Sequence, residues 1–420
     1  MIDAAVGETQ VSPPSLDSLL LELDCQALVV LATSSRDSYL APFLAAGRLH
    51  RSLLVAPRGG SPRLAYMTPM ERGEAATSGL DLLTPEALDV LRWSREGASP
   101  AQFLGNVLSR ALQLCEVASG RLAVAGNVSA GEVLGAAELL AAEGWSFVPG
   151  EGVVERLRKR KTNDQIASIE EAAVGTCEAM RRVASLLAAS TTTDTGALVL
   201  EGEPLAVGRL RSEIARTLSE RGLEQPWGNI VAPAEEGAVP HNSGTDDRQL
   251  RAGESLVVDV FPKSRLAADC TRTFCVGEPS DPLARGHAEV LAALEASAAS
   301  ARPGVRAWDL QAAVCEHFAG SGWPTPVDTP GTTRGYVHGL GHGVGFEVHE
   351  MPSFRQEANA WEGCLEVGDV ITLEPGLYEP EPTEGTVGWA VRLEDLYVVE
   401  PDGVRNLTPL PYDLDPRAWD

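Results

Sequence analysis

Four apolar, strand-like runs in the second half of the chain each contain or directly adjoin an acidic residue. The runs are ESLVVDVF, CTRTFCVG, GDVITLEPGLY and WAVRLEDLYVVE, and the acidic residues are Asp259, Asp269, Glu374 and Glu394. A carboxylate buried among apolar residues is costly unless something compensates its charge, so each of the four requires a nearby cation. An arginine could serve one of them, but four together favour a metal site and require a fold that brings these runs together.

The patterns in this half of the chain predict an α+β architecture. Asp259 and Asp269 are joined by VFPKSRLAA, in which residues 262–265 supply a turn, so the two carboxylates could face each other across a hairpin. Apolar residues recur at helical spacing in three stretches, at about 164–189, 281–301 and 306–320. Helices segregated from a mainly antiparallel sheet are therefore expected.

Residues 1–155 show a different pattern, which predicts an N-terminal α/β domain before a catalytic domain over 156–420. Apolar runs such as ALVVLA, SLLVAP and RLAVAG alternate with helix-like stretches, as in domains that pack helices on a short sheet. The basic stretch RLRKRKTND follows at the boundary. We expect a solvated linker there, leading into a helix that Thr162, Asn163 or Asp164 could cap.

Three of the seven histidines, His338, His342 and His349, fall within twelve consecutive positions that overlap the stretch GHGVGFEVHE. The alternating glycines do not fit a dinucleotide-binding loop, and the G-K-[ST] of a Walker loop is absent. His338 and His342 have the spacing of a zinc-protease helix, but the glycines make a helix costly at ~1 kcal/mol each. An extended or looped backbone is therefore expected, with one or two of these histidines facing a cleft.

Composition excludes several classes of function. The net charge of −25 repels phosphate backbones, so nucleic-acid binding is not expected. The apolar runs are shorter than the ~20 residues of a membrane span, and the first residues lack a basic and apolar leader, so we expect no membrane insertion and a cytoplasmic location. The seven cysteines are scattered without a C-x-x-C pair, which favours neither a disulfide framework nor a structural zinc site.

Four carboxylates with one imidazole form a hard, oxygen-rich set of ligands. Such a set suits two divalent cations, such as Mn²⁺, Co²⁺ or Zn²⁺, that share bridging carboxylates. One nitrogen ligand is too few for a typical structural zinc site. We therefore expect a site for two divalent ions, with Mn²⁺ as the leading candidate.

The order Asp, Asp, His, Glu, Glu resembles that of the pita-bread metallopeptidases of family M24, within which the proline-specific branch contains prolidase and aminopeptidase P. The motifs are VVDVF, AADCTRTF, HGLGHGVGFEVHE, ITLEPGLY and VRLED, spread over residues from about 230 to 400. The resemblance implies a C-terminal pita-bread domain, an N-terminal domain like that of creatinase, and a homodimer. Asp259 and Asp269 are ten residues apart where the family usually has eleven, and RLAAD lacks the usual Gly-Tyr, so we expect a remodelled hairpin beside the substrate pocket.

The same resemblance implies a role for each site residue. The implied metal ligands are Asp259, Asp269, His342, Glu374 and Glu394. Asp259 and Asp269 would bind one ion. Asp269, His342 and Glu374 would bind the other, and Glu394 would bridge the two. The implied substrate-side residues are His241, His338, His349 and Arg392.

Two cations that share one water would lower its pKa from ~16 towards neutrality and so supply a hydroxide nucleophile. In this mechanism His338 or His349 stabilises the oxyanion, and Glu374 moves a proton to the leaving nitrogen. His241 and Arg392 are candidates to hold a substrate carboxylate or to brace the metal ligands. Alternatively, Arg392 simply pairs with one of the two acidic residues that follow it.

The leading expectation is an Xaa-Pro dipeptidase (prolidase), which acts on Xaa-Pro dipeptides or short peptides with proline in second place. Aminopeptidase P is the main alternative, since the ligand motifs do not determine the length of the peptide that the enzyme accepts. A methionine aminopeptidase would share the metal site but not the extra N-terminal domain. A creatinase-like hydrolase would work without metal, and a peptide-binding module would have lost ligands. Because all five ligand positions are retained, the sequence favours the peptidase.

Overall fold

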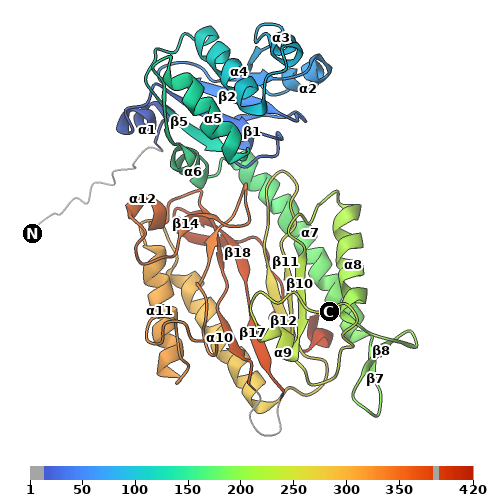
Figure 1. Cartoon of the computed structure of the whole chain (residues 1–420). Coiled ribbons are helices and arrows are strands. Elements are labelled where there is room, and N and C mark those ends of the chain that lie inside the picture. Colours follow the sequence, from blue (N-terminus) through green and yellow to red (C-terminus); the bar gives the residue numbers. More distant parts are fainter. Residues whose placement is uncertain (1–13, 382–386, 420) are drawn as a thin grey trace, which may run out of the picture. The chain divides into compact units, whose positions relative to one another are not determined.

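The computed structural model describes residues 14–381 and 387–419. Contacts between residues divide the chain into two units, Met1–Arg158 and Lys159–Asp420, and each is described by itself (Figure 1). Within the described ranges, no helix combines the length and the apolar character that crossing a membrane requires.

The first unit is built on a six-stranded sheet with the strand order β4-β3-β2-β1-β5-β6. Its strands are β1 (Ala27–Ala32), β2 (Ser52–Pro57), β3 (Arg63–Tyr66), β4 (Asp81–Leu83), β5 (Arg121–Gly126) and β6 (Ser146–Pro149). Its helices are α1 (Leu16–Glu22), α2 (Arg72–Ala76), α3 (Val90–Arg95), α4 (Pro100–Leu114), α5 (Ala130–Ala141) and α6 (Glu151–Lys159), with 3₁₀ turns at Ala41–Phe43 and Pro69–Glu71. The sheet is mixed, because β1 pairs with β2 antiparallel and with β5 parallel.

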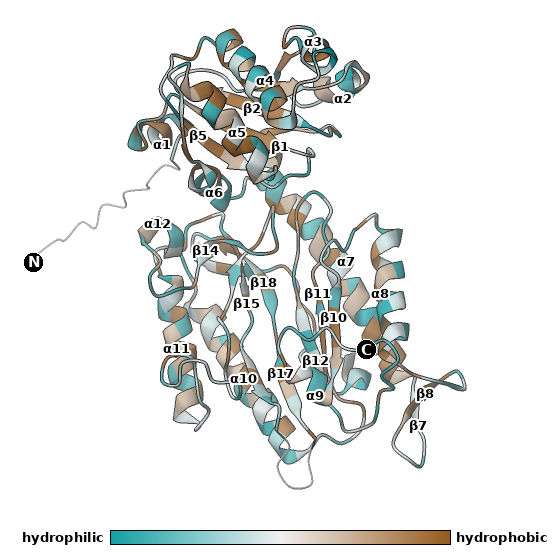
Figure 2. Cartoon of the chain, in the orientation of Figure 1, coloured by the Kyte–Doolittle hydropathy of each residue, from teal (hydrophilic) through white to brown (hydrophobic). Residues whose placement is uncertain are grey.

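Alternate residues of β1 show why this sheet is covered on both faces. Leu28 and Val30 join one apolar cluster, which includes residues of α1 and α6. Val29 and Leu31 join a second cluster, which includes residues of α4 and α5. Successive side chains of a strand point to opposite faces, so a run that is apolar throughout buries both. Figure 2 shows these strands as an apolar layer, and the predicted α/β domain is confirmed.

The second unit is α+β. Its strands are β7 (Thr191–Thr192), β8 (Leu198–Leu200), β9 (Glu203–Pro204), β10 (Asn229–Pro233), β11 (Leu256–Val260), β12 (Thr271–Phe274), β13 (His342–Gly343), β14 (Glu350–Ser353), β15 (Val370–Leu373), β16 (Gly376–Glu379), β17 (Trp389–Arg392), β18 (Asp395–Glu400) and β19 (Gly403–Asn406). Its helices are α7 (Asn163–Ala188), α8 (Val207–Glu220), α9 (Ala234–Gly237), α10 (Asp281–Ser300), α11 (Ala307–Gly320) and α12 (Ala360–Gly363), with a 3₁₀ turn at Pro416–Trp419. The three predicted helices correspond to α7, α10 and α11.

The strands of the second unit form antiparallel sheets, ordered β10-β11-β12, β14-β13-β15-β18-β19, β16-β17 and β7-β8-β9. A single bridge between Thr271 and Glu394 connects the end of β12 to the segment between β17 and β18. Helices α7 and α8 pack on each other and contact β10 and β11, whereas α10 and α11 share an apolar cluster with β15 to β18 (Figure 1). The helices thus pack against the strands of these sheets.

The basic stretch at the boundary is not a solvated linker, and that expectation was wrong. Arg158, Lys159 and Lys161 are buried, because each finds a buried carbonyl or carboxylate partner. The expected helix cap is confirmed. Thr162 Oγ1 accepts the N–H of Gln165 at 3.3 Å, and the Gln165 side chain accepts the N–H of Thr162 at 3.0 Å, which closes a capping box at the start of α7.

Candidate metal centre

Asp259 and Asp269 reach the centre from the two arms of the β11–β12 hairpin. Asp259 lies in β11 opposite Thr271, and Asp269 lies two residues before Thr271. Both side chains belong to buried residues. The hairpin therefore brings the two carboxylates to the same end of the strand pair, as the turn between them predicted.

Glu374 and Glu394 lie at breaks between strands rather than inside strands. Glu374 and Pro375 separate β15 from β16, and Leu393 with Glu394 separates β17 from β18. An apolar run does not show where the hydrogen bonds between two strands end, so the sequence predicts unbroken strands through both glutamates. At the second break, Thr271 Oγ1 donates to Glu394 Oε2 at 2.7 Å, and the Glu394 N–H donates to the Thr271 carbonyl at 3.0 Å. The break thereby fixes both the backbone and the carboxylate of Glu394.

His342, in β13, supplies the imidazole of the cluster. Its Nε2 lies 3.5 Å from Glu374 Oε1 and 3.8 Å from Asp269 Oδ2. One potential ligand atom from each of Asp269, His342 and Glu394 lies within 4.8 Å of the others. The second ring nitrogen, Nδ1, is 3.2 Å from the carbonyl oxygen of Gly343. A proton on Nδ1 satisfies that carbonyl and leaves Nε2 with a lone pair for a cation.

Burial shifts the pKa of most groups in the cluster. It raises the pKa of Asp269 and of Glu394 well above the usual range, and repulsion from the neighbouring carboxylates adds to the rise. Burial also raises the pKa of Glu374 to about 8, although the positive charge of Arg392 opposes the shift. The same burial, with His349 nearby, lowers the pKa of His342 to about 3, so its imidazole is neutral at pH 7.

Three buried carboxylate oxygens of the cluster have no hydrogen-bond partner among the described residues. They are Asp259 Oδ1, Asp269 Oδ1 and Glu394 Oε1. Buried polar atoms in folded proteins are nearly always paired, so three such atoms in one place call for a missing partner. Oxygen donors beside one neutral imidazole are the ligands that divalent cations of the Mn²⁺ type prefer. The residues present therefore fit divalent cations.

Arg392 pairs with Asp259, and not with either of the acidic residues that follow it in sequence. Its Nη2 donates to Asp259 Oδ2 at 2.6 Å and its Nη1 donates to the Tyr378 hydroxyl at 2.9 Å. That hydroxyl lies 2.9 Å from His338 Nε2, and His338 Nδ1 lies 2.7 Å from the carbonyl oxygen of Gly339. The carbonyl can only accept, so Nδ1 carries the proton and Nε2 accepts from Tyr378. Both ring nitrogens of His338 are thus bound within the protein.

All nine predicted site residues line one cavity of about 780 Å³. They are His241, Asp259, Asp269, His338, His342, His349, Glu374, Arg392 and Glu394. The ring centroid of His349 lies 4.2 Å from that of His342, with the rings 78° apart. Burial lowers the pKa of His338 to about 4 and also lowers the pKa of His349. Among the described residues no hydrogen bond occupies the His349 ring, so it can offer an N–H to a ligand in the cavity.

Sequence reasoning missed two residues that support the cavity from behind and three that line it. Tyr378 and Thr271 stand in the same apolar runs as the carboxylates, and a polar atom in an apolar strand was the signal that could have identified them. Trp227, Ile230 and Phe261 form an apolar part of the cavity wall. No pattern in the sequence distinguishes these three from ordinary core or surface residues.

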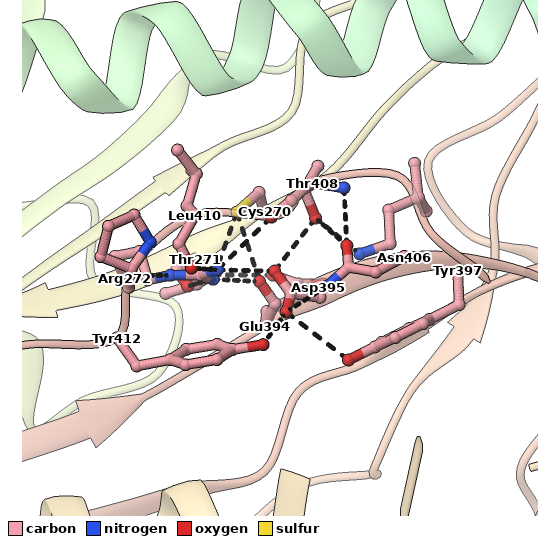
Figure 3. A network of polar contacts seen from close by, with 12 residues as sticks. Cys270, Thr271, Arg272, Glu394, Asp395, Tyr397, Asn406, Thr408, Leu410 and Tyr412 are labelled. Carbon is pink, nitrogen blue, oxygen red and sulfur yellow. Dashed lines mark hydrogen bonds and ion pairs between the residues drawn. The ribbon is translucent and has the colours of Figure 1, made fainter. Parts of the chain in front are cut away.

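A second buried polar network lies directly behind Glu394 (Figure 3). Arg272 is fully buried, and its Nη2 donates to Asp395 Oδ1 at 2.6 Å while its Nη1 donates to the Glu394 carbonyl at 2.7 Å. The other oxygen of Asp395 accepts from Asn406 Nδ2 at 2.8 Å and from the Tyr412 hydroxyl at 2.5 Å. Asp395 is therefore the partner of Arg272, and the network fixes the backbone that carries Glu394.

A sequence profile of metallopeptidase family M24 matches residues 167–401, which is more than half of the chain. The chain belongs to family M24. It is 31% identical over 269 residues to the uncharacterized peptidase YqhT of Bacillus subtilis, covering 64% of this chain and 67% of that protein. It is 29% identical over 268 residues to the Xaa-Pro dipeptidase of Pyrococcus furiosus, covering 62% and 66%. Alignments with these relatives and with the probable dipeptidase PepE of Mycobacterium tuberculosis span between 53% and 67% of the relatives' own lengths.

Solved structures show the fold of this M24 chain. The prolidase from Pyrococcus furiosus superposes with a TM-score of 0.71 at 22% identity, covering 94% of this chain and 99% of that one. The X-Pro aminopeptidase from Thermotoga maritima superposes with a TM-score of 0.70 at 21% identity, covering 95% and 98%. The expectation of a pita-bread fold preceded by an N-terminal domain is confirmed.

Proposed function

We propose that the chain is a dinuclear, metal-dependent peptidase that hydrolyses Xaa-Pro bonds, in particular those of dipeptides. The observation that carries this proposal is the buried cluster of carboxylates around one imidazole, with three carboxylate oxygens that lack a partner among the described residues. Membership of family M24 and the similarity to an Xaa-Pro dipeptidase support it. The use of Mn²⁺, a homodimer and a cytoplasmic location stay predictions.

The proposed ligands for two cations are Asp259, Asp269, His342, Glu374 and Glu394. Bound divalent cations supply a water of lowered pKa and a Lewis acid for the scissile carbonyl. Two of the carboxylates are held in place for cation binding by hydrogen bonds from the chain. Arg392 occupies Asp259 Oδ2 and Thr271 occupies Glu394 Oε2, and in each case the other oxygen is the one without a partner. Each carboxylate is thus held by one oxygen and presents the second.

The remaining chemistry falls to three side chains. Glu374, whose Oε1 lies 3.5 Å from His342 Nε2, is the proposed carrier of a proton to the leaving nitrogen. His349 is the proposed donor to the developing oxyanion, because the ring nitrogens of His338 are already bound. His338 then acts with Tyr378 and Arg392 as a brace for Asp259, and His241 remains the candidate to hold a substrate carboxylate.

Selectivity for proline requires space rather than a hydrogen bond, because the nitrogen of an Xaa-Pro bond carries no hydrogen. Trp227, Ile230 and Phe261 give the cavity an apolar wall against which a proline ring can pack. The cavity of about 780 Å³ has room for more than a dipeptide. Aminopeptidase P activity is therefore the second candidate, and the similarity to the Thermotoga maritima X-Pro aminopeptidase structure is consistent with it.

The test is a substrate comparison with purified protein loaded with Mn²⁺. Cleavage of Ala-Pro and Met-Pro in preference to Arg-Pro-Pro supports a dipeptidase, and the reverse preference supports aminopeptidase P. Cleavage of Met-Ala-Ser with no activity on Xaa-Pro bonds would instead indicate a methionine aminopeptidase. Absence of cleavage by protein that is shown to contain metal contradicts the proposed class.

A further inference from the structure

Lys161, at the start of the second unit, buries its charge completely. Its Nζ lies 2.5 Å from Glu350 Oε1, and the two side chains are 0% and 1% exposed. The Nζ also donates to the Lys159 carbonyl at 2.9 Å, and the backbone N–H of Lys161 donates to the Gly368 carbonyl at 2.8 Å. Apolar residues often replace a buried ion pair without loss of stability, so stability alone does not explain such a pair.

The ion pair packs against the loop 345–349, which lies between β13 and β14. Glu350 Oε2 accepts the backbone N–H of Glu347 at 3.2 Å, and the Gly345 N–H donates to the Glu347 carbonyl at 3.0 Å. A Cβ at Gly345 would lie 2.5 Å from Lys161 Cε and 2.6 Å from Glu350 Oε1. Only glycine allows the loop backbone to lie this close to the ion pair.

The same loop delivers His349 to the cavity. His349 directly precedes Glu350, and its ring stacks edge-on against that of His342. In the β13–β14 pairing, Glu350 lies opposite Gly343, the neighbour of His342. The carboxylate that binds Lys161 is therefore one residue from the proposed oxyanion donor and is tied to the strand that holds the proposed imidazole ligand.

We propose that the Lys161–Glu350 ion pair is a positioning device for His349, and that it anchors the loop 345–349 so that the imidazole keeps its place in the cavity. The catalytic consequence rests on the proposed function, whereas the anchoring is a property of the chain alone. Lys161 does not line the cavity, so it acts through His349 and is a positioning residue. A misplacement of about 1 Å in a catalytic group can cost roughly a hundredfold in rate.

Lys159 provides a matched control two residues away. Its Nζ lies 3.3 Å from Asp369 Oδ2 and donates to the Cys364 carbonyl at 2.8 Å, and the Lys159 and Asp369 side chains are 4% and 0% exposed. It is therefore also a buried lysine paired with a buried carboxylate. Its partners lie in the segment 364–369, so its loss leaves the anchor of the His349 loop in place.

The experiment compares Lys161→Met and Lys159→Met with the wild type. Amide hydrogen exchange is measured on the metal-free proteins, and hydrolysis of Ala-Pro is measured with Mn²⁺. In Lys161→Met we expect exchange over residues 344–350 to become at least ~10-fold faster, and kcat to fall roughly 10- to 100-fold with KM and bound Mn²⁺ unchanged. In Lys159→Met we expect faster exchange only around 364–369 and a kcat close to that of the wild type.

Unchanged exchange over 344–350 in Lys161→Met overturns the proposal, as does an equal fall of kcat in both variants or faster exchange with kcat unaltered. If Lys161→Met does not fold, Glu350→Gln is measured in its place. That variant keeps the volume of the side chain but removes its charge, and the same outcomes apply. If the metal-loaded wild type cleaves neither Ala-Pro nor Arg-Pro-Pro, the proposed function fails, and the exchange comparison still decides whether the pair anchors the loop.

Discussion

Two clusters of buried charge meet at Glu394, and their hydrogen bonding differs. In the network of Figure 3, both oxygens of Asp395 accept hydrogen bonds. The donors to Asp395 include Arg272, Asn406, Thr408 and Tyr412. In the candidate metal centre, three carboxylates each keep one buried oxygen without a partner among the described residues. Asp395 and Arg272 are fully buried and the three carboxylates are less than a tenth exposed, but only the first cluster is complete by itself.

This difference distinguishes a structural network from a ligand site. A network that satisfies all of its own charges fixes the backbone and needs nothing from solution. A cluster with unpaired buried oxygens is unfavourable until a cation enters, and its raised carboxyl pKa values express that cost. The two lie back to back at Glu394, because Arg272 donates to the Glu394 carbonyl while the Glu394 carboxylate belongs to the ligand site.

The largest expected effect comes from breaking the complete network. Arg272→Met leaves the buried carboxylate of Asp395 without its cation, so we expect the free energy of unfolding to fall by about 3–5 kcal/mol. Thermal or urea unfolding of the variant measures the loss. Added Mn²⁺ should not restore it, because the network has no site for a cation.

Arg417→Met is the control for this variant. It removes an arginine whose ion pair with Asp415 is largely exposed, and exposed pairs contribute little. Equal, small losses in Arg272→Met and Arg417→Met would show that the buried network does not hold the unit together.

The next prediction separates the two neighbouring histidines of the incomplete cluster. His342→Ala should weaken Mn²⁺ binding by more than about 100-fold, since loss of a residue that merely supports a ligand already costs roughly 10- to 100-fold. His349→Ala should keep the metal and lower kcat by roughly 100- to 1000-fold, the usual cost of removing an oxyanion donor. Metal analysis and steady-state kinetics measure both, and equal loss of metal in the two variants would contradict the division.

The smallest effect is a dependence of stability on pH that only the incomplete cluster should show. Glu374 has a pKa of about 8 in the folded protein against an ordinary 4.5, and the pKa values of Asp269 and Glu394 move in the same direction. The folded state binds more protons, so this stabilisation is complete below pH 4.5 and is lost as the pH rises through 8. The pKa values of His338 and His342 are lowered from 6.5 by folding, so these two residues reduce the stability of the folded protein only below about pH 6.5.

We therefore expect the Tm of the metal-free protein to be lower at pH 9 than at pH 6.5, by roughly 2–4 °C for each kcal/mol lost. Saturating Mn²⁺ should remove most of this difference, because a bound cation takes the place of the protons. Differential scanning calorimetry at the two pH values measures both. A metal-free protein that is equally stable at pH 6.5 and pH 9 would show that folding does not raise the pKa values of these carboxyl groups.

The ligand residues could be found in the sequence because a charge within an apolar run is a local signal. Asp259 in VVDVF and Glu394 in VRLED stand out without knowledge of their neighbours. The partner of Arg392 could not be found in this way. It pairs with Asp259, 133 residues earlier in the chain, and that contact exists only once β11 and β17 have come together. A sequence suggests nearby partners, whereas the folded chain selects distant ones.

The fold, like the candidate site, could be predicted in part from the sequence. Alternating strand-like and helix-like runs predicted the first unit, and helices segregated from apolar strand-like runs predicted the α+β second unit. Neither pattern showed the strand breaks at Glu374 and Glu394, since hydrophobicity continues across each break. The burial of Lys161 could not be predicted from the sequence either. A run of basic residues indicates solvent exposure, and only the tertiary structure shows the buried carboxylate of Glu350 that receives this lysine.

Calorimetric titration of the metal-free protein with Mn²⁺ tests the central claim most directly, namely that the incomplete cluster is a site for two cations. We predict two equivalents of Mn²⁺ per wild-type chain, and greatly weakened binding of both in Asp269→Asn, since Asp269 is proposed to touch both ions. Binding of no Mn²⁺ or of a single equivalent by the wild type, or undiminished binding by Asp269→Asn, would contradict it.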